Sequence, residues 1–264
     1  MEVQELLNKM WIDYCGLNSS AKKIYDLLTS EGELVLNDHI ALRTFKHPRL
    51  GIESMAKTFK NLGYKEVQDY HFKLKKLYAK HYEHEDVSKS KIFISELLLD
   101  QMSPSMQRTI DELVAQIPEE TINQPNFSFS GRTWNLSHKA FENLAAESEY
   151  ASWVASIGFR PNHFTININA MKKFNSVELI NQWLESKGFR LNSSGGKIKG
   201  TPQELLEQSS TMAELIDISF DEGVFKVPGC YYEFARRYAD SSGRIYQGFI
   251  AASADKIFES TNRQ

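Results

Sequence analysis

The sequence contains the stretch Asn37-Asp38-His39-Ile40-Ala41-Leu42-Arg43-Thr44-Phe45 and, later, the similar stretch Pro161-Asn162-His163-Phe164-Thr165-Ile166-Asn167-Ile168-Asn169. Each has the pattern of a short strand with a histidine near its start. A helical pattern follows each stretch and ends at a glycine before an aromatic residue, 24 residues after the first histidine and 25 after the second. Such a repeat, with one histidine from each copy, can build a metal site on a pseudo-twofold axis. A histidine on a strand is more often a hydrogen-bonded core residue, so the repeat alone leaves both interpretations open.

Alternation along the first strand decides which of its side chains can act together. Successive side chains point to opposite faces, so His39 and Arg43 share one face while Ile40 and Leu42 share the other. Four residues of strand span about 13 Å, which places Arg43 within reach of a small molecule bound near His39. In the second copy the position that corresponds to Arg43 is Asn167, which is uncharged. Only one end of a cavity between the copies would then be strongly cationic.

Composition is that of an ordinary globular protein. The chain has 264 residues, 41% hydrophobic and 25% charged, and its net charge of -3 gives no general electrostatic case for nucleic acid or an anionic membrane. No apolar run approaches the roughly 18 residues that span a bilayer, and the charged residues among the first ten do not fit a signal peptide. The two cysteines, Cys15 and Cys230, are too few for a disulfide framework or a zinc–cysteine cluster. We expect a cytoplasmic protein with reduced thiols and with no nucleic-acid or membrane partner.

The predicted elements follow the order strand, helix, three strands, and the second half repeats this order with one further strand at its end. Helices are expected within residues 2–30, broken near residues 16–20, with Ser19 or Ser20 as the N-cap of the second helix. The expected elements of the first unit are a strand at 39–45, a helix at 52–62 and strands at 65–70, 73–83 and 91–99. Those of the second are a strand at 163–169, a helix at 175–187 and strands near 189–193 and at 215–220, 230–238 and 245–250. Between the expected strands near 189–193 and at 215–220, Thr201 and Pro202 are expected to begin a short helix.

We therefore expect residues 1–264 to form one compact unit with five parts. These are N-terminal helices (1–34), a first module (35–103), a helical insertion (104–160), a second module (161–250) and a C-terminal tail (251–264). Helices are expected at 104–117 and 138–157 within the insertion, and the tail is expected to be helical or frayed.

Glu233 adds a carboxylate to the two histidines. It lies in the strand pattern Cys230-Tyr231-Tyr232-Glu233-Phe234-Ala235-Arg236-Arg237-Tyr238. A carboxylate midway along an apolar strand costs free energy unless it is paired or bound to a cation, and a salt bridge with Arg236 or Arg237 is the simplest alternative. Two histidines and one carboxylate with open positions are the ligand set of non-haem Fe(II) oxygenases.

These segments resemble the vicinal oxygen chelate superfamily, which is built from paired βαβββ modules. More closely, they resemble the 2-oxoadipate dioxygenase/decarboxylase (hydroxyglutarate synthase) family. The resemblance covers roughly residues 35–250 and rests on four segments: Asp38 to Phe45, Asn162-His163-Phe164-Thr165, Ser95-Glu96-Leu97 and Tyr232-Glu233-Phe234. It implies an α+β fold in which paired βαβββ modules form a curved mixed sheet around a metal site, with extra helices at the N-terminus and between the modules.

The resemblance also implies the chemistry. Fe(II), or another divalent metal in the isolated protein, would be held by His39, His163 and Glu233, and Arg43 would be the catalytic, substrate-binding arginine. The enzyme would act on a small 2-oxo dicarboxylic acid and O2, converting 2-oxoadipate to 2-hydroxyglutarate and CO2. Because one chain carries both modules, no oligomer is required to close the site.

Two rival functions remain open from the residues. One is a glyoxalase-like metal-dependent lyase or isomerase, with Glu96 as a fourth ligand; the other is a non-enzymatic module that binds a small molecule. Glu96 shares a strand face with Ile92 and Ile94 and so points inward, and we favour a supporting or structural role for it.

Alternation adds Tyr231 and Arg237 as candidates for the cavity wall. Three further histidines lie in a polar, lysine-rich region and are expected to be solvated: His71, His81 and His84. Cys230 is expected to be buried rather than reactive.

Overall fold

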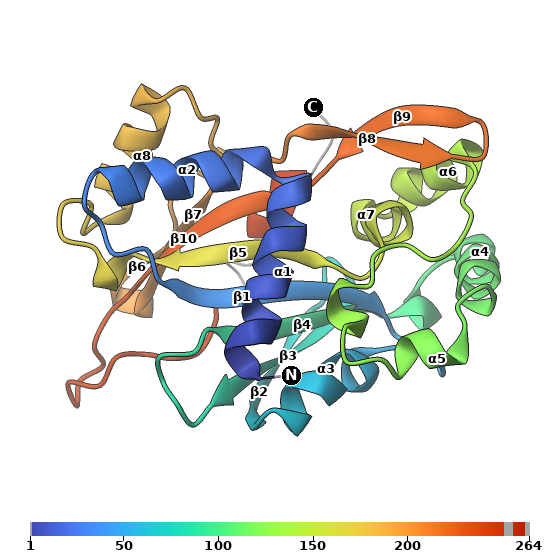
Figure 1. The fold of residues 1–264 in the computed structure, drawn as a ribbon, viewed down its shortest axis with the longest axis horizontal. Helices are drawn as coiled ribbons and strands as arrows, with labels where there is room; N and C mark the ends of the chain where they lie inside the picture. The colour runs from blue at the N-terminus through green and yellow to red at the C-terminus, as the bar shows by residue number, and fades with distance from the viewer. Residues whose placement is uncertain (1, 251–255, 262–264) are drawn as a thin grey trace.

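The structure, a computed structural model, describes residues 2–250 and 256–261. Its centre is a mixed sheet of eight strands among the described residues (Figure 1). In spatial order the strands are β2 (Tyr64–Phe72), β3 (Leu77–His84), β4 (Lys91–Leu97), β1 (Asn37–Phe45), β5 (Pro161–Asn167), β10 (Tyr231–Arg237), β7 (Leu206–Ser210) and β6 (Lys199–Thr201).

The sheet has an internal repeat about the β1–β5 pair. These two strands run antiparallel, and each has a parallel partner on its other side, β4 beside β1 and β10 beside β5. Helix α3 (Ile52–Asn61) follows β1, and α8 (Val177–Ser186) follows β5. The expected α+β architecture of paired modules in one mixed sheet is thus confirmed.

The second module differs from the prediction in its outer strands. Residues 215–220 form β8 (Leu215–Phe220), but β8 pairs only with β9 (Gly223–Pro228) in a separate hairpin. Residues 189–193 and 245–250 are not strands and contribute only the isolated bridges of Leu191 and Ile245. Their place in the sheet is taken by β7 and the short β6. The prediction missed β7 because its sequence is polar; it is buried because Gln208, Ser209 and Ser210 form hydrogen bonds with buried side chains.

The helices fall into two groups. Helices α1 (Val3–Leu17) and α2 (Ser19–Ser30) precede β1, and the insertion forms α4 (Pro104–Ala115), α5 (Glu119–Ile122), α6 (His138–Glu147) and α7 (Glu149–Ile157). The N-cap of α2 is Asn18, not Ser19 or Ser20. The Asn18 side chain accepts a hydrogen bond from the Ala21 N–H, so the helix begins directly after the asparagine. Short 3-10 turns complete the described chain: η1 (Leu99–Gln101), η2 (Phe127–Phe129), η3 (Ile168–Ala170), η4 (Pro202–Glu204) and η5 (Phe258–Thr261). Thr201 caps η4 as expected, whereas residues 251–255 and 262–264 of the predicted tail lie outside the described residues.

Helix packing makes the two faces of the sheet chemically different. Helices α1, α2, α3 and α8 pack on one face (Figure 1), where Phe164 and Tyr232 contact Trp11 of α1 with ring centroids 5.1 and 5.7 Å apart. Alternation turns the neighbours His163 and Glu233 to the other face. There, segments from residues 245–249 and 256–261 cover the strands through contacts such as Phe249 on His39 and Ser260 on Ser210.

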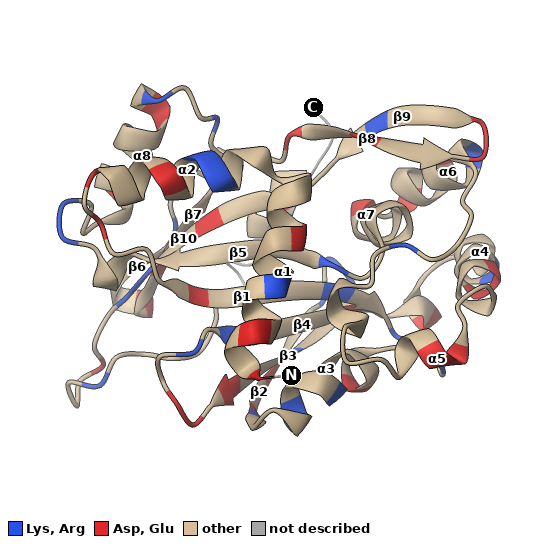
Figure 2. Cartoon of the chain, in the orientation of Figure 1, with Lys and Arg blue, Asp and Glu red and all other residues tan. Residues whose placement is uncertain are grey.

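Charge is spread evenly over the fold. Figure 2 shows acidic and basic residues interspersed along the ribbon rather than gathered on one element. Among the helices described here, none is both long and apolar enough to cross a membrane.

Candidate metal centre

The structure brings together the two histidines and the glutamate that the sequence singled out. His39 on β1, His163 on β5 and Glu233 on β10 each offer a ligand atom, and these atoms all lie within 4.8 Å of one another. The three residues are 2%, 4% and 1% exposed. The Nε2 atoms of His39 and His163 lie 3.6 and 3.2 Å from the two oxygens of Glu233.

A β-bulge precedes each histidine. In the β1–β5 pairing Asn37 faces Ile166 and His39 faces Thr165, so Asp38 is the extra residue; Asn162 is the extra residue on the other strand. A bulge re-aims the side chain of the inserted residue. Here each inserted side chain turns to its own histidine: Asp38 Oδ1 lies 2.8 Å from His39 Nδ1, and Asn162 Oδ1 lies 3.0 Å from His163 Nδ1.

These hydrogen bonds fix the tautomer of both imidazoles. An oxygen acceptor at Nδ1 requires the proton to be on Nδ1, which leaves a lone pair on each Nε2. The Nε2 of His163 faces Glu233, whereas the Nε2 of His39 lies near both Thr165 Oγ1 and Glu233. The Glu233 Oε2 atom is buried and accepts no hydrogen bond from the described residues. The lone pair of His163 and a buried carboxylate oxygen therefore face each other, and a proton or a cation between them would stabilise this arrangement.

Burial sets the ionisation of all three groups. Burial lowers the pKa of His39. It lowers the pKa of His163 well below its ordinary value, and the neighbouring His39 and Arg43 lower the pKa of His163 further. Both imidazoles are thus neutral, as metal binding requires. Burial raises the pKa of Glu233 to about 8, despite the hydrogen bond from Gln208. A divalent cation bound to this carboxylate would favour its negatively charged form.

Several residues around the ligands were not assigned a role from sequence. Gln208 donates to Glu233 Oε1 at 2.5 Å, Thr165 Oγ1 lies 3.0 Å from His39 Nε2, and the Phe249 ring packs edge-on against His39 at 4.8 Å. For Asp38 and Asn162 a signal existed, because each directly precedes a repeated histidine. Gln208 lies on a strand that was not predicted and Phe249 in a segment wrongly predicted as a strand, so no sequence signal placed them here.

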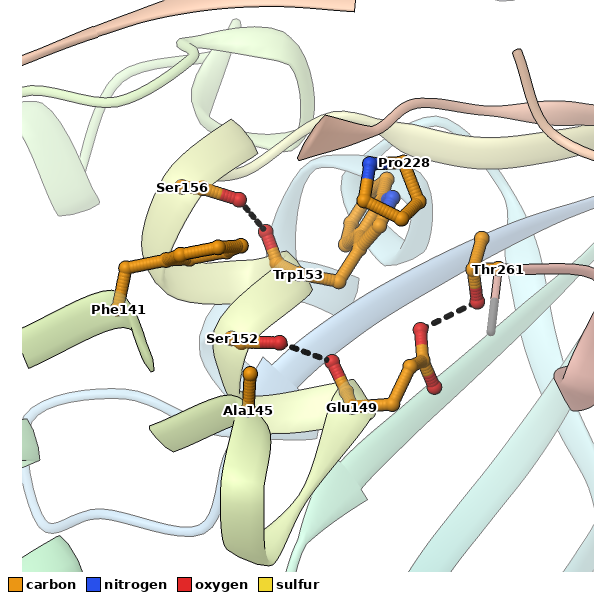
Figure 3. A pocket seen from close by; sticks show the side chains of 8 residues that line it. All are labelled: Phe141, Ala145, Glu149, Ser152, Trp153, Ser156, Pro228 and Thr261. Carbon is orange, nitrogen blue, oxygen red and sulfur yellow. Dashed lines mark hydrogen bonds between the residues drawn. The ribbon is translucent and has the colours of Figure 1, made fainter. Parts of the chain in front are cut away.

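Arg43 is on the same face as the ligands but is already paired. Its Nη1 donates to Glu149 Oε1 at 3.0 Å, its Nη2 lies 3.3 Å from Thr261 Oγ1, and its guanidinium lies over the rings of Tyr150 and Trp153. Figure 3 shows the Thr261 hydroxyl donating a hydrogen bond to the Glu149 carboxylate at a pocket of about 220 Å³, which both residues and Trp153 line. The Arg43 end of the site therefore adjoins a surface pocket, with the Glu149 carboxylate between the two.

The other candidate residues from the sequence lie in different environments. Tyr231 lines the ligand face and stacks on His163, and Arg237 forms an ion pair with Asp38 rather than with Glu233. Glu96 lies on the opposite face, where its Oε2 accepts from the Ile52 N–H at the start of α3. Cys230 is buried, as expected, and burial raises the pKa of its thiol to about 12.

The expectation that His81 is solvated was wrong. His81 is fully buried on β3 between Tyr70 and Glu83, with its Nδ1 2.8 Å from the Tyr70 hydroxyl. The lysine-rich sequence around it concealed this position, because alternation buries every second residue of an otherwise polar strand. His71 is exposed as expected, and His84 is partly buried against the Leu62 carbonyl.

The chain also resembles known proteins over almost its whole length. A family model described as 2-oxoadipate dioxygenase/decarboxylase matches residues 12–126 and 119–245. A chloroplastic 2-oxoadipate dioxygenase/decarboxylase of Arabidopsis thaliana is 36% identical over 286 residues, which cover 98% of this chain and 77% of the relative. The chain belongs to this family. The expectation of an enzyme of the 2-oxoadipate dioxygenase/decarboxylase kind is thereby confirmed.

Solved structures with a similar fold agree with this family assignment. The hydroxyglutarate synthase of Oryza sativa, crystallised with 2-oxoadipate, has a TM-score of 0.89 at 33% identity and covers 97% of this chain and 91% of its own. A protein of Shewanella frigidimarina, provisionally termed a hydrolase, has a TM-score of 0.91 at 47% identity, covering 95% of this chain and 98% of its own. A glyoxalase superfamily protein of Ralstonia eutropha, at 19% identity and a TM-score of 0.76, covers 92% of this chain and 84% of its own. At that identity the likeness concerns the fold alone.

Proposed function

We propose that this chain is an Fe(II)-dependent dioxygenase and decarboxylase of a 2-oxo dicarboxylic acid, with 2-oxoadipate as the substrate. One 2-oxoadipate and one O2 would give one 2-hydroxyglutarate and one CO2, which balances all atoms. The observation that carries the proposal is that ligand atoms of His39, His163 and Glu233 all lie within 4.8 Å of one another, with Glu233 Oε2 buried and without a hydrogen-bond partner among the described residues. The plant relatives and the rice structure supply the substrate class.

The ligand set suits Fe(II) among the divalent metals. Two imidazoles and one carboxylate leave coordination positions open, and these are the ligands of non-haem Fe(II) oxygenases. When bound, the metal would take the 2-oxo acid and O2 in the open positions and supply the oxidation chemistry.

The protein residues would position the substrate and keep the ligands in place. Asp38 and Asn162 orient the imidazoles, Gln208 orients Glu233, and Phe249 covers His39 against water. Arg43 would attract the distal carboxylate of the substrate, because a guanidinium binds carboxylates through a pair of parallel hydrogen bonds. Since Glu149 holds the same guanidinium, the substrate carboxylate would compete with it.

The position of Glu96 disfavours a glyoxalase-like lyase or isomerase with four protein ligands. Its carboxylate lies on the helix-covered face and is engaged by Ile52. Within the described chain, the residues grouped for a metal are His39, His163 and Glu233. A three-ligand site leaves room for a chelating substrate and O2, as the dioxygenase needs.

Oxygen uptake tests the proposal directly. Protein loaded with Fe(II) without oxygen is supplied with 2-oxoadipate, 2-oxoglutarate or 2-oxoisocaproate, and O2 consumption and CO2 release are recorded. We expect equal uptake and release with 2-oxoadipate, loss of both with His39→Ala, and full activity with the matched control His71→Ala, whose side chain is exposed. Full metal content and turnover in His39→Ala, or no uptake with any acid, would refute the proposal.

A further inference from the structure

Tyr231 is a buried tyrosine within the ligand face. It is the register partner of His163 on the neighbouring parallel strand, and its ring stacks on the His163 imidazole with centroids 4.5 Å apart and an interplanar angle of 25°. The side chain is fully buried.

The Tyr231 hydroxyl proton has no acceptor among the described residues. A phenol has an ordinary pKa of about 10, so the hydroxyl is protonated at neutral pH and acts as a donor, and its charged neighbour Arg43 offers donors only. Leaving a buried donor unpaired costs about 1–3 kcal/mol, a cost that a bound acceptor would remove.

Strand register places this donor between the metal ligands and Arg43. On β5, Thr165 is the register partner of both His39 and Glu233. His163, two residues earlier on the same face, is the register partner of Ala41 and Tyr231. Arg43 follows Ala41 on the same face of β1. The order along the face is thus Glu233 with His39, then His163 with Tyr231, then Arg43.

We propose that the Tyr231 hydroxyl donates a hydrogen bond to the distal carboxylate of the substrate, beside Arg43, and so selects a 2-oxo dicarboxylic acid over a 2-oxo monocarboxylic acid. This inference rests on the proposed function. A carboxylate is the acceptor that both donors need, and a neutral donor suits a position where Glu149 already neutralises part of the guanidinium charge. The first carboxylate and the 2-oxo group remain free to face the metal ligands.

The test uses a tyrosine pair that lies on one strand. Tyr231→Phe keeps the ring and its stacking and removes only the hydroxyl. Tyr232→Phe is the matched control, because the Tyr232 hydroxyl is also buried and without a hydrogen-bond partner but lies on the helix-covered face. Each metal-loaded protein is titrated without oxygen against 2-oxoadipate and against 2-oxohexanoate, which has the same chain length and no distal carboxylate; turnover is then measured with O2.

For Tyr231→Phe we expect the Kd and KM for 2-oxoadipate to rise about 10- to 100-fold, the scale of a hydrogen bond to a charged group. The Kd for 2-oxohexanoate should change less than about twofold, and Tyr232→Phe should match the wild type with both acids. Equal weakening of both acids, or no weakening of 2-oxoadipate binding, would overturn the inference.

The binding titration separates this inference from the proposed function. If the wild type binds 2-oxoadipate but consumes no O2, the proposed reaction fails while the Tyr231 comparison still decides the contact. If the wild type does not bind 2-oxoadipate, both fail.

Discussion

Asp38 and Arg237, 199 residues apart in sequence, form a buried ion pair in which both carboxylate oxygens contact the guanidinium, at 2.7 and 2.8 Å. The same carboxylate holds His39 Nδ1, and the same guanidinium donates to the carbonyls of Tyr246 and Gly248. Burial alone would raise the pKa of Asp38, but Arg237 and the hydrogen bond to His39 hold it well below its usual range. One pair thus links a ligand histidine to the segment that covers it.

Replacing Asp38 with asparagine should damage both stability and metal binding. Arg237 would become a buried charge without its counterion, which typically costs about 3–5 kcal/mol, and His39 would lose its charged acceptor, which typically costs about 10- to 100-fold in metal affinity. Urea unfolding of the metal-free protein and a metal titration measure the two effects. Asp26→Asn, at an exposed helix pair with Lys22, serves as the control; equal behaviour of the two variants would contradict the assignment.

Replacing Glu149 with glutamine should strengthen binding of a dicarboxylate. Glu149 occupies the Arg43 guanidinium in the structure, and an ion pair worth about 1 kcal/mol would lower the KM for 2-oxoadipate about fivefold when removed. Steady-state kinetics measure this against Glu112→Gln, an exposed position. A higher KM would instead show that Glu149 orients Arg43 for the substrate.

Replacing Glu96 with glutamine should leave metal binding intact. The carboxylate accepts a hydrogen bond at the start of α3, where a negative charge stabilises a helix by about 0.3–1 kcal/mol. We therefore expect a small loss of unfolding free energy and an unchanged metal affinity, measured by urea unfolding and by titration. A tenfold or greater loss of metal affinity would favour the lyase or isomerase, in which Glu96 is a ligand.

Lys199 should give the protein a stability that rises with pH. Burial lowers the pKa of Lys199 to about 8, although Glu233 and Glu259 raise it, while in the unfolded chain it stays near 10.5. Between these values the unfolded state binds the additional proton, so the unfolding free energy increases from about pH 8 to about pH 10.5 and the contribution is lost as pH falls.

Lys199→Met removes this titration and so provides its own test. The difference in unfolding free energy between wild type and variant should change across that pH window and be flat below it. A difference that is constant at all pH values would show that Lys199 has an ordinary pKa in the folded protein.

The fold was predictable where hydrophobic alternation is strong. Strands β1, β5 and β10 and helices α3 and α8 lie near their expected positions because apolar residues recur at the period of each element. β7 was missed because polar residues such as Gln208 and Ser210 are buried through hydrogen bonds, and these depend on partners far away in sequence. The burial of His81 was missed for the same reason, because it depends on partners that the strand's own polar sequence does not show.

The sequence by itself determined the repeat, the strand faces and the identity of the three candidate ligands, because alternation within a strand is local. Only the tertiary structure decided which oxygen holds each histidine, since Asp38 and Asn162 reach the ligands through bulges that depend on the pairing of β1 with β5. It also decided that Arg43 meets Glu149, that Arg237 meets Asp38 and that Glu96 faces α3. The physical reason is that strand register is a non-local property: one inserted residue changes which face a side chain occupies, and pattern within one strand does not record its partner.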